Sequence, residues 1–304
     1  MSEPNPILFS MRESAGLRLA VLFGSFFILL ILSSIIGAGI DALPIDARNK
    51  ILITSGVQCL LAFCFPAIIL ARFSSNKWKE WLCLTKTPKI RSFAGVLIVY
   101  FISLPAMEWL IEWNSQLHLP ESMAALEQTL RGWEETANAT TEILLETHGF
   151  FPVLAGVLVV GVLTGFSEEL FFRGGLQGIL VKSSMHPGTA VWIAAIIFST
   201  MHFQFFGFFP RLLMGVFFGF LLLWSGSIWL PVFAHLLNNS VVVILSSVTG
   251  NVSAGVVDSV SPGFLNENII PVVISVILTS LLLIFFRNYL FKKDNNLELS
   301  WRKR

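Results

Sequence analysis

Residues Ser167 to Arg173 read Ser-Glu-Glu-Leu-Phe-Phe-Arg and follow an apolar run, Phe150 to Phe166, that carries no charge. An ionised side chain is costly close to hydrocarbon, so it is retained there only with partners, with water or for a chemical task. Glu168, Glu169 and Arg173 place three such side chains in one short stretch. The rest of the chain must therefore supply partners or a chemical task for these three side chains.

The composition indicates an integral membrane protein. Hydrophobic residues make up 55% of the 304 residues and charged residues 13%, and the mean hydropathy of +0.76 is far from that of a soluble domain. Membrane lipids are therefore expected partners. The formal net charge is +1 and basic residues form only short clusters, which disfavours nucleic acid as a partner. Three cysteines, Cys59, Cys64 and Cys83, do not suggest a disulfide framework.

Apolar runs of about 20 residues, the length that crosses a bilayer, predict an all-α polytopic bundle with about eight transmembrane helices. The expected spans cover residues 19–40, 51–71, 93–113, 150–174, 189–206, 210–225, 228–248 and 269–287. The first span is interpreted as a retained anchor. Very tight turns separate the fifth to seventh spans, so one of these helices is a candidate for a short or re-entrant helix.

Basic residues in the short loops predict the orientation. The second loop carries six of them: Arg72, Lys77, Lys79, Lys86, Lys89 and Arg91. This loop is expected in the cytoplasm, and with eight spans both termini then lie on the cytoplasmic side, in agreement with the basic tail 287–304. The loop 114–149 holds six glutamates and one arginine, and the loop 249–268 holds no Lys or Arg, so both are expected outside. The membrane is expected to be the cell membrane, or the inner membrane if the source is bacterial.

The chain is expected to form a single membrane domain over residues 1–304, with its polar centre within about 150–248. No second domain and no internal repeat is evident in the sequence. The outer loop 114–149 is expected to contain an amphipathic helix, either lying on the membrane or covering the polar centre. Its signals are Pro120, Glu121 and Ser122, followed at helical spacing by Leu126, Leu130 and Trp133.

Few polar residues in the late spans could act on a substrate. They are His202, His235, Asn238 and Asn239, with Gln204 close to the first. His235 and Asn239 are four residues apart and share one face of a helix, whereas Asn238 points elsewhere.

The same spacing of four lets Glu169 and Arg173 pair, which leaves Glu168 as the free acid. A carboxylate whose ionisation is tuned by burial and a neighbouring charge suits general-base action on water. A purely structural interpretation also exists, in which Glu168 and Arg173 form a buried pair, Arg173 reaches the interface, or a histidine only packs. The joint occurrence of these groups favours a functional site.

The depths of the candidate residues agree only in part. Glu168 and His202 lie 17 residues on either side of position 185, within a turn-like segment, so a helical hairpin would bring them to one depth. Counted from the expected ends of their spans, however, Glu168 and His235 lie near the cytoplasmic face and His202 lies deeper.

Three motifs together resemble those of the CPBP family of intramembrane proteases, which includes type II CAAX prenyl endopeptidases, bacteriocin-processing and immunity proteins, and bacterial Abi proteins. The motifs are Glu168-Glu169-x-x-x-Arg173, Phe198-x-x-x-His202 and His235-x-x-x-Asn239. They span about 75 residues of the chain, and their order and spacing together are far more specific than any one of them. The turn from Gly226 to Trp229 is also similar to the family, whose core is a bundle of about eight helices.

The resemblance implies a peptide-bond hydrolase acting on a membrane-associated protein or peptide, lipidated in some members. It implies that Glu168 and His202 activate the attacking water, that His235 and Asn239 stabilise the oxyanion, and that Glu169 and Arg173 support the motif helix. It also implies a site that opens toward the cytoplasm. Peptide hydrolysis does need a base for water and donors where negative charge develops.

No cofactor is favoured, although zinc is the alternative. Its ligands would be Glu168, His202 and His235, a set found at catalytic zinc sites. No His-Glu-x-x-His spacing is present in the sequence, and Asn239 is a poor zinc ligand, so we favour a metal-free, glutamate-type site.

Two competing functions stay open at this stage. The first is a non-catalytic membrane immunity factor or scaffold that uses the same polar cluster for binding. The second is a polar cluster that only stabilises the bundle.

Overall fold

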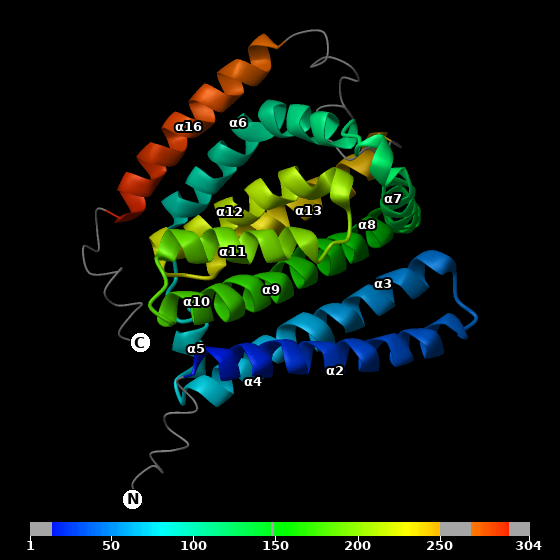
Figure 1. Ribbon diagram of the computed structural model, residues 1–304, viewed down its shortest axis with the longest axis horizontal. Helices are drawn as coiled ribbons and strands as arrows, with labels where there is room; N and C mark the ends of the chain where they lie inside the picture. The colour runs from blue at the N-terminus through cyan, green and yellow to red at the C-terminus, as the bar shows by residue number, and fades with distance from the viewer. Residues whose placement is uncertain (1–13, 147–148, 250–268, 292–304) are drawn as a thin grey trace, which may run out of the picture.

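The computed structural model describes residues 14–146, 149–249 and 269–291. Most of its helices run back and forth between the same two ends of the molecule (Figure 1). The first described helix begins, and the last one ends, at the same end of the bundle (Figure 1). Most of the loop 249–268 and the basic residues from Lys292 onward lie outside the described ranges, so their expected locations stay predictions.

The first half of the chain forms an N-terminal helical hairpin, a long third helix and a helix in the acidic loop. The elements are α2 (Ala15–Asp41), α3 (Ala47–Gln58), the π-helical η1 (Cys59–Cys64), α4 (Phe65–Ser74), α5 (Trp78–Trp81), α6 (Ile90–Ser115), the 3-10 turn η2 (Glu121–Met123) and α7 (Ala124–Leu145). The helix expected in the loop 114–149 is therefore present as α7. The three cysteines are free thiols.

The second half forms the core that carries the motif residues. Its elements are α8 (Phe150–Gly156), η3 (Val157–Leu163), α9 (Thr164–Glu169), η4 (Leu170–Gln177), α10 (Gly178–Lys182), α11 (Pro187–Thr200), η5 (Phe205–Gly207), α12 (Phe208–Ser225), α13 (Trp229–Thr249) and α16 (Ile270–Phe291). The elements α8 to α10 are continuous, with two π-helical stretches inside one long helix. Such stretches are rare and occur often at functional sites.

Seven helical segments in the described ranges are long and apolar enough to cross a membrane, which confirms the polytopic helical bundle. The eighth, α11, has only 14 residues, and at about 1.5 Å per residue it is about 21 Å long, against about 30 Å of hydrocarbon. The fifth span is therefore the short helix that the tight turns indicated. Its last expected residues, 201–206, form a turn and the start of η5 instead.

A helical hairpin joins the segments that carry Glu168 and His202. The helix that carries Glu168 does not end near residue 174 but continues to Lys182, and α11 begins at Pro187 on the other side of the turn. Glu168 is therefore not near the end of its helix. The discrepancy in the sequence-based depths arose from ending that span eight residues too early.

The turn that leads into α13, the helix that carries His235, is packed inside the protein. Ser227 and Ile228 are fully buried in the turn before α13. The Ile228 N–H donates to the carbonyl of Cys83, and the Trp229 indole donates to the carbonyl of Leu84. These bonds attach the turn to the loop after α5. Gly226 takes the left-handed conformation, with φ of 64°, that ends α12.

Small residues let the core helices approach closely. A Cβ added at Gly165 would lie 3.1 Å from the backbone nitrogen of Leu236, so α9 and α13 meet at backbone contact. On α12, Gly215 faces Ala195 of α11 in the same way. Close approach of this kind lets helices associate within a membrane, where burial of apolar surface offers little driving force. It also brings Glu168 and Glu169 within reach of α13.

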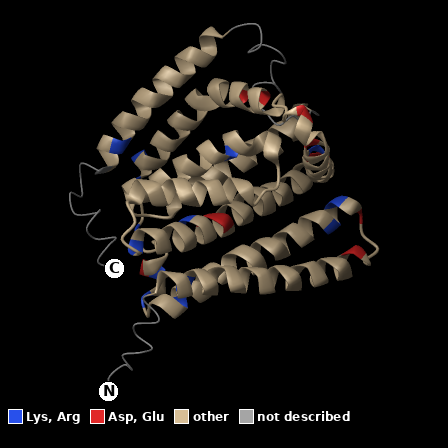
Figure 2. Cartoon of the chain, in the orientation of Figure 1, with Lys and Arg blue, Asp and Glu red and all other residues tan. Residues whose placement is uncertain are grey.

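Charged residues are distributed unequally between the two ends. Figure 2 shows most Asp and Glu at the end of the bundle where α7 lies, whereas many Lys and Arg lie at the end with α5 and α10. This distribution agrees in sign with the orientation that the basic loop predicts. The assignment of the basic end to the cytoplasm stays a prediction.

Candidate active site

Glu169 is the centre of a buried row of charged groups. It is fully buried in α9, and its Oε1 accepts hydrogen bonds from Arg173 Nη1 and from His235 Nδ1, each at 2.9 Å. The bond to Arg173 confirms the pair that the spacing of four predicted. The bond to His235, from α13, was not predicted, and it shows that Glu169 holds the imidazole as well as the guanidinium. Because Nδ1 of His235 donates to a carboxylate, its Nε2 is the nitrogen that faces the site.

Arg173 is held by oxygens and aromatic rings on all sides. Its Nη2 donates to the carbonyl of Gly215 on α12, at 3.0 Å. Its guanidinium carbon lies 4.6 Å from the ring centroid of Phe198 and 5.3 Å from that of Phe218. Cation–π contacts of this kind stabilise a desolvated cation. Arg173 is therefore a buried structural residue, and it does not extend to the membrane interface.

Glu168 is the acid that bonds neither Arg173 nor His235. Its Oε2 is buried without a hydrogen-bond partner and lies 3.9 Å from Nε2 of His235. A gap of that length is too long for a hydrogen bond and is wide enough for the two groups to share a small ligand such as water. The sequence predicted Glu168 as the acid left over, and the geometry agrees.

His202 joins the cluster through Phe198. The ring centroid of Phe198 lies 4.8 Å from that of His202 and 6.0 Å from that of His235, so one phenyl ring separates the two imidazoles. Nδ1 of His202 bonds the carbonyl of Phe198 at 2.8 Å. A carbonyl only accepts, so this nitrogen carries the proton and the neutral ring keeps Nε2 as an acceptor. The direct neighbour of Glu168 in this structure is His235.

The amides of α13 contact the helix that carries Glu168. Nδ2 of Asn239 donates to the carbonyl of Val160 at 2.9 Å, and its Oδ1 accepts from Asn238 at 3.2 Å. One N–H of Asn239 is thus used in packing, and the second one is the donor that a ligand could use. Asn238 supports Asn239, a role that the sequence did not indicate.

The zinc alternative requires three ligands in one place. Among the residues that the structure describes, no three or more His, Cys, Asp or Glu side chains gather as they would around a metal ion. Both histidines do have the outer hydrogen bond that zinc-bound histidines usually make. Since Glu168, His202 and His235 do not converge on one point, we derive no step through a metal.

Arg211, at the start of α12, is a half-buried cation that the sequence did not indicate. It donates to the backbone and side-chain oxygens of Gln204, and its charge interacts with those of Glu168 and Glu134. Arg211 has no acidic residue at helical spacing, so no local pattern pointed to it. The sequence did show an arginine within an apolar span, and a charge in that position is costly enough to mark a candidate functional residue.

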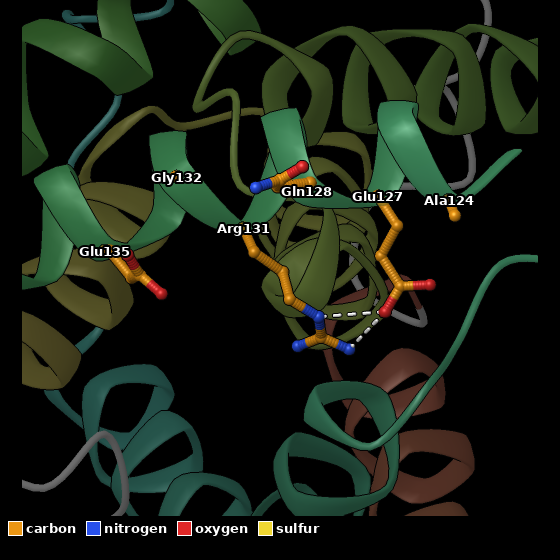
Figure 3. Close-up of a pocket in the computed structure, with 6 residues that line it drawn as sticks. All are labelled: Ala124, Glu127, Gln128, Arg131, Gly132 and Glu135. Atoms are coloured by element: carbon orange, nitrogen blue, oxygen red, sulfur yellow. Dashed lines mark hydrogen bonds and ion pairs between the residues drawn. The ribbon is translucent and has the colours of Figure 1, made fainter.

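A pocket lies on α7, away from the motif residues. Figure 3 shows the residues that line it, with Glu127 and Arg131 joined by an ion pair. Glu127 also accepts from the backbone N–H of Leu119 and contacts His118. These bonds lower the pKa of Glu127 from its ordinary value to about 2. The pocket belongs to the attachment of α7 and contains none of the predicted catalytic residues.

The fold and the site together define an integral, multi-pass membrane protein with a buried cluster of two acids, two histidines and arginine at the centre of its helices. Residues 150–241 match the family described as type II CAAX prenyl endopeptidase Rce1-like. The matched segment contains all seven motif residues and confirms the resemblance to CAAX-type membrane proteases. No curated protein and no solved structure matches the chain. The match and the helical membrane fold together suggest a CAAX-protease type of function.

Proposed function

We propose that this protein is an intramembrane endopeptidase that cleaves a membrane-associated protein or peptide. The observation that carries the proposal is the contrast between two adjacent acids. Both acids have a buried Oε2 without a hydrogen-bond partner. Glu169, however, accepts hydrogen bonds from Arg173 and His235 through its Oε1, whereas the contact of Glu168 with His235 is 3.9 Å long and leaves this buried carboxylate without a close partner. Such a group is costly unless it has a ligand or a chemical task. The match of residues 150–241 to a protease family indicates which task.

Glu168 is proposed as the base that activates water. A water between Glu168 and the histidines would lose a proton to the carboxylate while its oxygen bonds to the carbonyl carbon of the substrate. His202 would orient that water through its unprotonated Nε2, since its Nδ1 is bonded to the carbonyl of Phe198. The proton then passes to the leaving amine nitrogen as the carbon–nitrogen bond breaks, which regenerates the ionised acid.

The oxyanion of the tetrahedral intermediate needs donors in a dry environment. Asn239 offers its second N–H, and His235 offers Nε2–H when its ring carries both protons, since Nδ1–H is bonded to Glu169. Glu169 and Arg173 are proposed to hold His235 in this orientation. Their place in the reaction is to position a group, without contact with the substrate.

The proposal is tested by comparing Glu168→Gln and His202→Ala with the wild type in lipid vesicles. His186→Ala is the matched control, because His186 is an exposed histidine in the hairpin turn. Substrates are first found by trapping, as membrane peptides that are enriched on Glu168→Gln and cleaved by the wild type. We expect both site variants to insert and fold but to cleave nothing, and His186→Ala to cleave normally. Full turnover by Glu168→Gln would rule out the assigned role.

A metal-free reaction is part of the proposal and has its own measurement. The purified active protein is analysed for zinc by mass spectrometry, and cleavage is followed with and without a chelator. We expect cleavage to be insensitive to the chelator. Stoichiometric zinc that is lost together with activity would overturn this part of the proposal and leave the endopeptidase itself in place.

A further inference from the structure

Helix α7 lies on the segment that directly follows His202. Four contacts join it to residues 203–207, and three of them come from one face of α7, which carries Arg131, Glu134 and Asn138. Glu134 Oε2 accepts from the Phe206 N–H at 3.0 Å, Arg131 stacks on the Phe206 ring at 3.9 Å, Trp133 packs edge-on against Phe203 at 6.1 Å, and Asn138 Oδ1 accepts from Gln204 Nε2 at 3.4 Å. The acidic helix is therefore bound to a segment of the site by polar bonds and by ring contacts.

Residues of α12 and α6 also bond the segment 203–207. Arg211 donates to both oxygens of Gln204, and its guanidinium packs on Gly207 so closely that an added Cβ there would lie within 3.0 Å of it. On α6, the fully buried Asn114 donates to the carbonyl of Phe205 and accepts from the N–H of Phe209. Residues 203–207 are thus in contact with α6, α7 and α12, with Phe206 buried among them.

The backbone of this segment needs such support. Phe203 has a φ of 54°, in the left-handed region that a bulky residue rarely adopts. A strained backbone conformation of this kind is kept only where contacts with the surrounding structure hold it in place. Helix α11 ends at Thr200, so His202 lies just beyond its last turn. The position of the imidazole therefore depends on the conformation of residues 203–207.

Helix α7 buries little surface of its own. Leu145 is the one residue of α7 that is buried, and Leu126, Trp133 and Ile143 remain exposed. A helix with so little buried apolar surface gains its place from specific contacts. Glu134 and Asn138 bond residues 203–207, and Arg131 packs on Phe206 in addition to its bonds to Glu127 and to the Leu117 carbonyl. At the other end of α7, Arg48 of α3 donates to the carbonyl of Leu144. The contacts with residues 203–207 connect a helix outside the bundle with the proposed catalytic histidine.

We propose that α7 is a positioning element of the site, clamped to residues 203–207 through Glu134 and thereby holding His202 in its place on Phe198, beside the pair formed by Glu168 and His235. The inference rests on the proposed function, because it assigns α7 a role through His202. Glu134 is a positioning residue, since it acts on the backbone and does not reach the reacting atoms.

The test compares three variants on α7. Glu134→Ala removes the acceptor of the Phe206 N–H, Glu134→Gln keeps an acceptor oxygen without the charge, and Glu135→Ala is the matched control. Glu135 is exposed and lines the pocket shown in Figure 3 on another side of the helix. Each variant is measured for hydrogen exchange of peptides that cover residues 201–207 and for kcat and KM against a trapped substrate.

We expect Glu134→Ala to exchange faster at residues 201–207 and to lose about tenfold in kcat with KM unchanged, since a buried N–H left without its acceptor costs about 1–3 kcal/mol. The exchange rate and kcat of Glu134→Gln should lie closer to the wild-type values, and those of Glu135→Ala should equal them. If Glu134→Ala shows the wild-type exchange rate at residues 201–207 and the wild-type kcat, the proposed role of Glu134 and α7 is refuted. If Glu168→Gln is inactive in that case, the proposed function stands, whereas cleavage by Glu168→Gln overturns the proposed function itself.

Discussion

The two adjacent acids should respond in opposite ways to the same substitution. Glu169→Gln removes a fully buried charge that accepts from both Arg173 and His235, each at 2.9 Å. Glu168→Gln removes a charge whose Oε2 has no hydrogen bond and whose closest ion-pair contact, with His235, is 3.9 Å long. The amide has the same shape as the carboxylate in both cases. The comparison therefore isolates the value of the charge at two positions in one helical turn.

The magnitudes follow from the number of bonds lost. Removing one partner of a buried, hydrogen-bonded charge pair costs about 3–5 kcal/mol, and an amide that keeps one acceptor reduces this, so Glu169→Gln should lose about 2–4 kcal/mol. Burial of an unpaired carboxylate is unfavourable, so Glu168→Gln should change stability by less than about 0.5 kcal/mol or increase it. Activity should show no such contrast, because both variants are expected to lose cleavage.

The assay is unfolding of the purified variants in detergent, followed by circular dichroism of the helices. Cleavage of a trapped substrate is measured on the same samples below the unfolding transition. An equal loss of stability in the two variants would refute the division of roles between Glu168 and Glu169. It would mean that both acids are bonded in the folded protein.

Two further predictions concern packing and pH. Gly165→Ala should lower stability by about 1–3 kcal/mol and reduce cleavage, because its Cβ would lie 3.1 Å from the Leu236 nitrogen and α13 must move by a few tenths of an ångström. Gly24→Ala is the control, since nothing lies within 4 Å of its Cβ, and equal midpoints for the two variants in thermal unfolding would contradict the prediction. The second prediction follows from the lowered pKa of Glu127, about 2 in the folded protein, which the Leu119 N–H and Arg131 produce. A lowered pKa gives stability that is complete above the ordinary pKa, 4.5, and is lost as the pH falls toward 2. The thermal midpoint of the wild type should therefore exceed that of Glu127→Gln at neutral pH and approach it below pH 4.5, and a constant difference across this range would count against the attachment of α7 through Glu127.

Several features were predictable because they depend on neighbours in the chain. The long uncharged runs predicted the membrane bundle, because about 20 consecutive apolar residues are the length of helix that crosses the hydrocarbon of a bilayer. The spacing of four predicted the Glu169–Arg173 bond, because residues one turn apart always share a helix face. The turn-like segment around position 185 predicted the hairpin that joins Glu168 and His202. Local geometry was sufficient in each of these cases.

Other features depend on how the helices pack, and no local pattern reports them. The bond from His235 to Glu169 joins residues that are 66 positions apart, and it forms because Gly165 lets α9 and α13 approach to backbone contact. The contacts of α7 with residues 203–207 form because the chain turns after α11 and brings these residues next to α7. The length of α11 itself was uncertain in the sequence, because its apolar composition continues through residues that form a turn.

The sequence by itself was sufficient to predict that the two acids in Ser167 to Arg173 differ in their partners. The spacing to Arg173 pairs one acid and leaves the other free, whatever the other helices do. Only the tertiary structure decided what each acid faces. Glu169 bonds His235, Glu168 keeps an unpaired oxygen beside it, and α7 is joined to the segment after His202, because long-range helix contacts place these groups together.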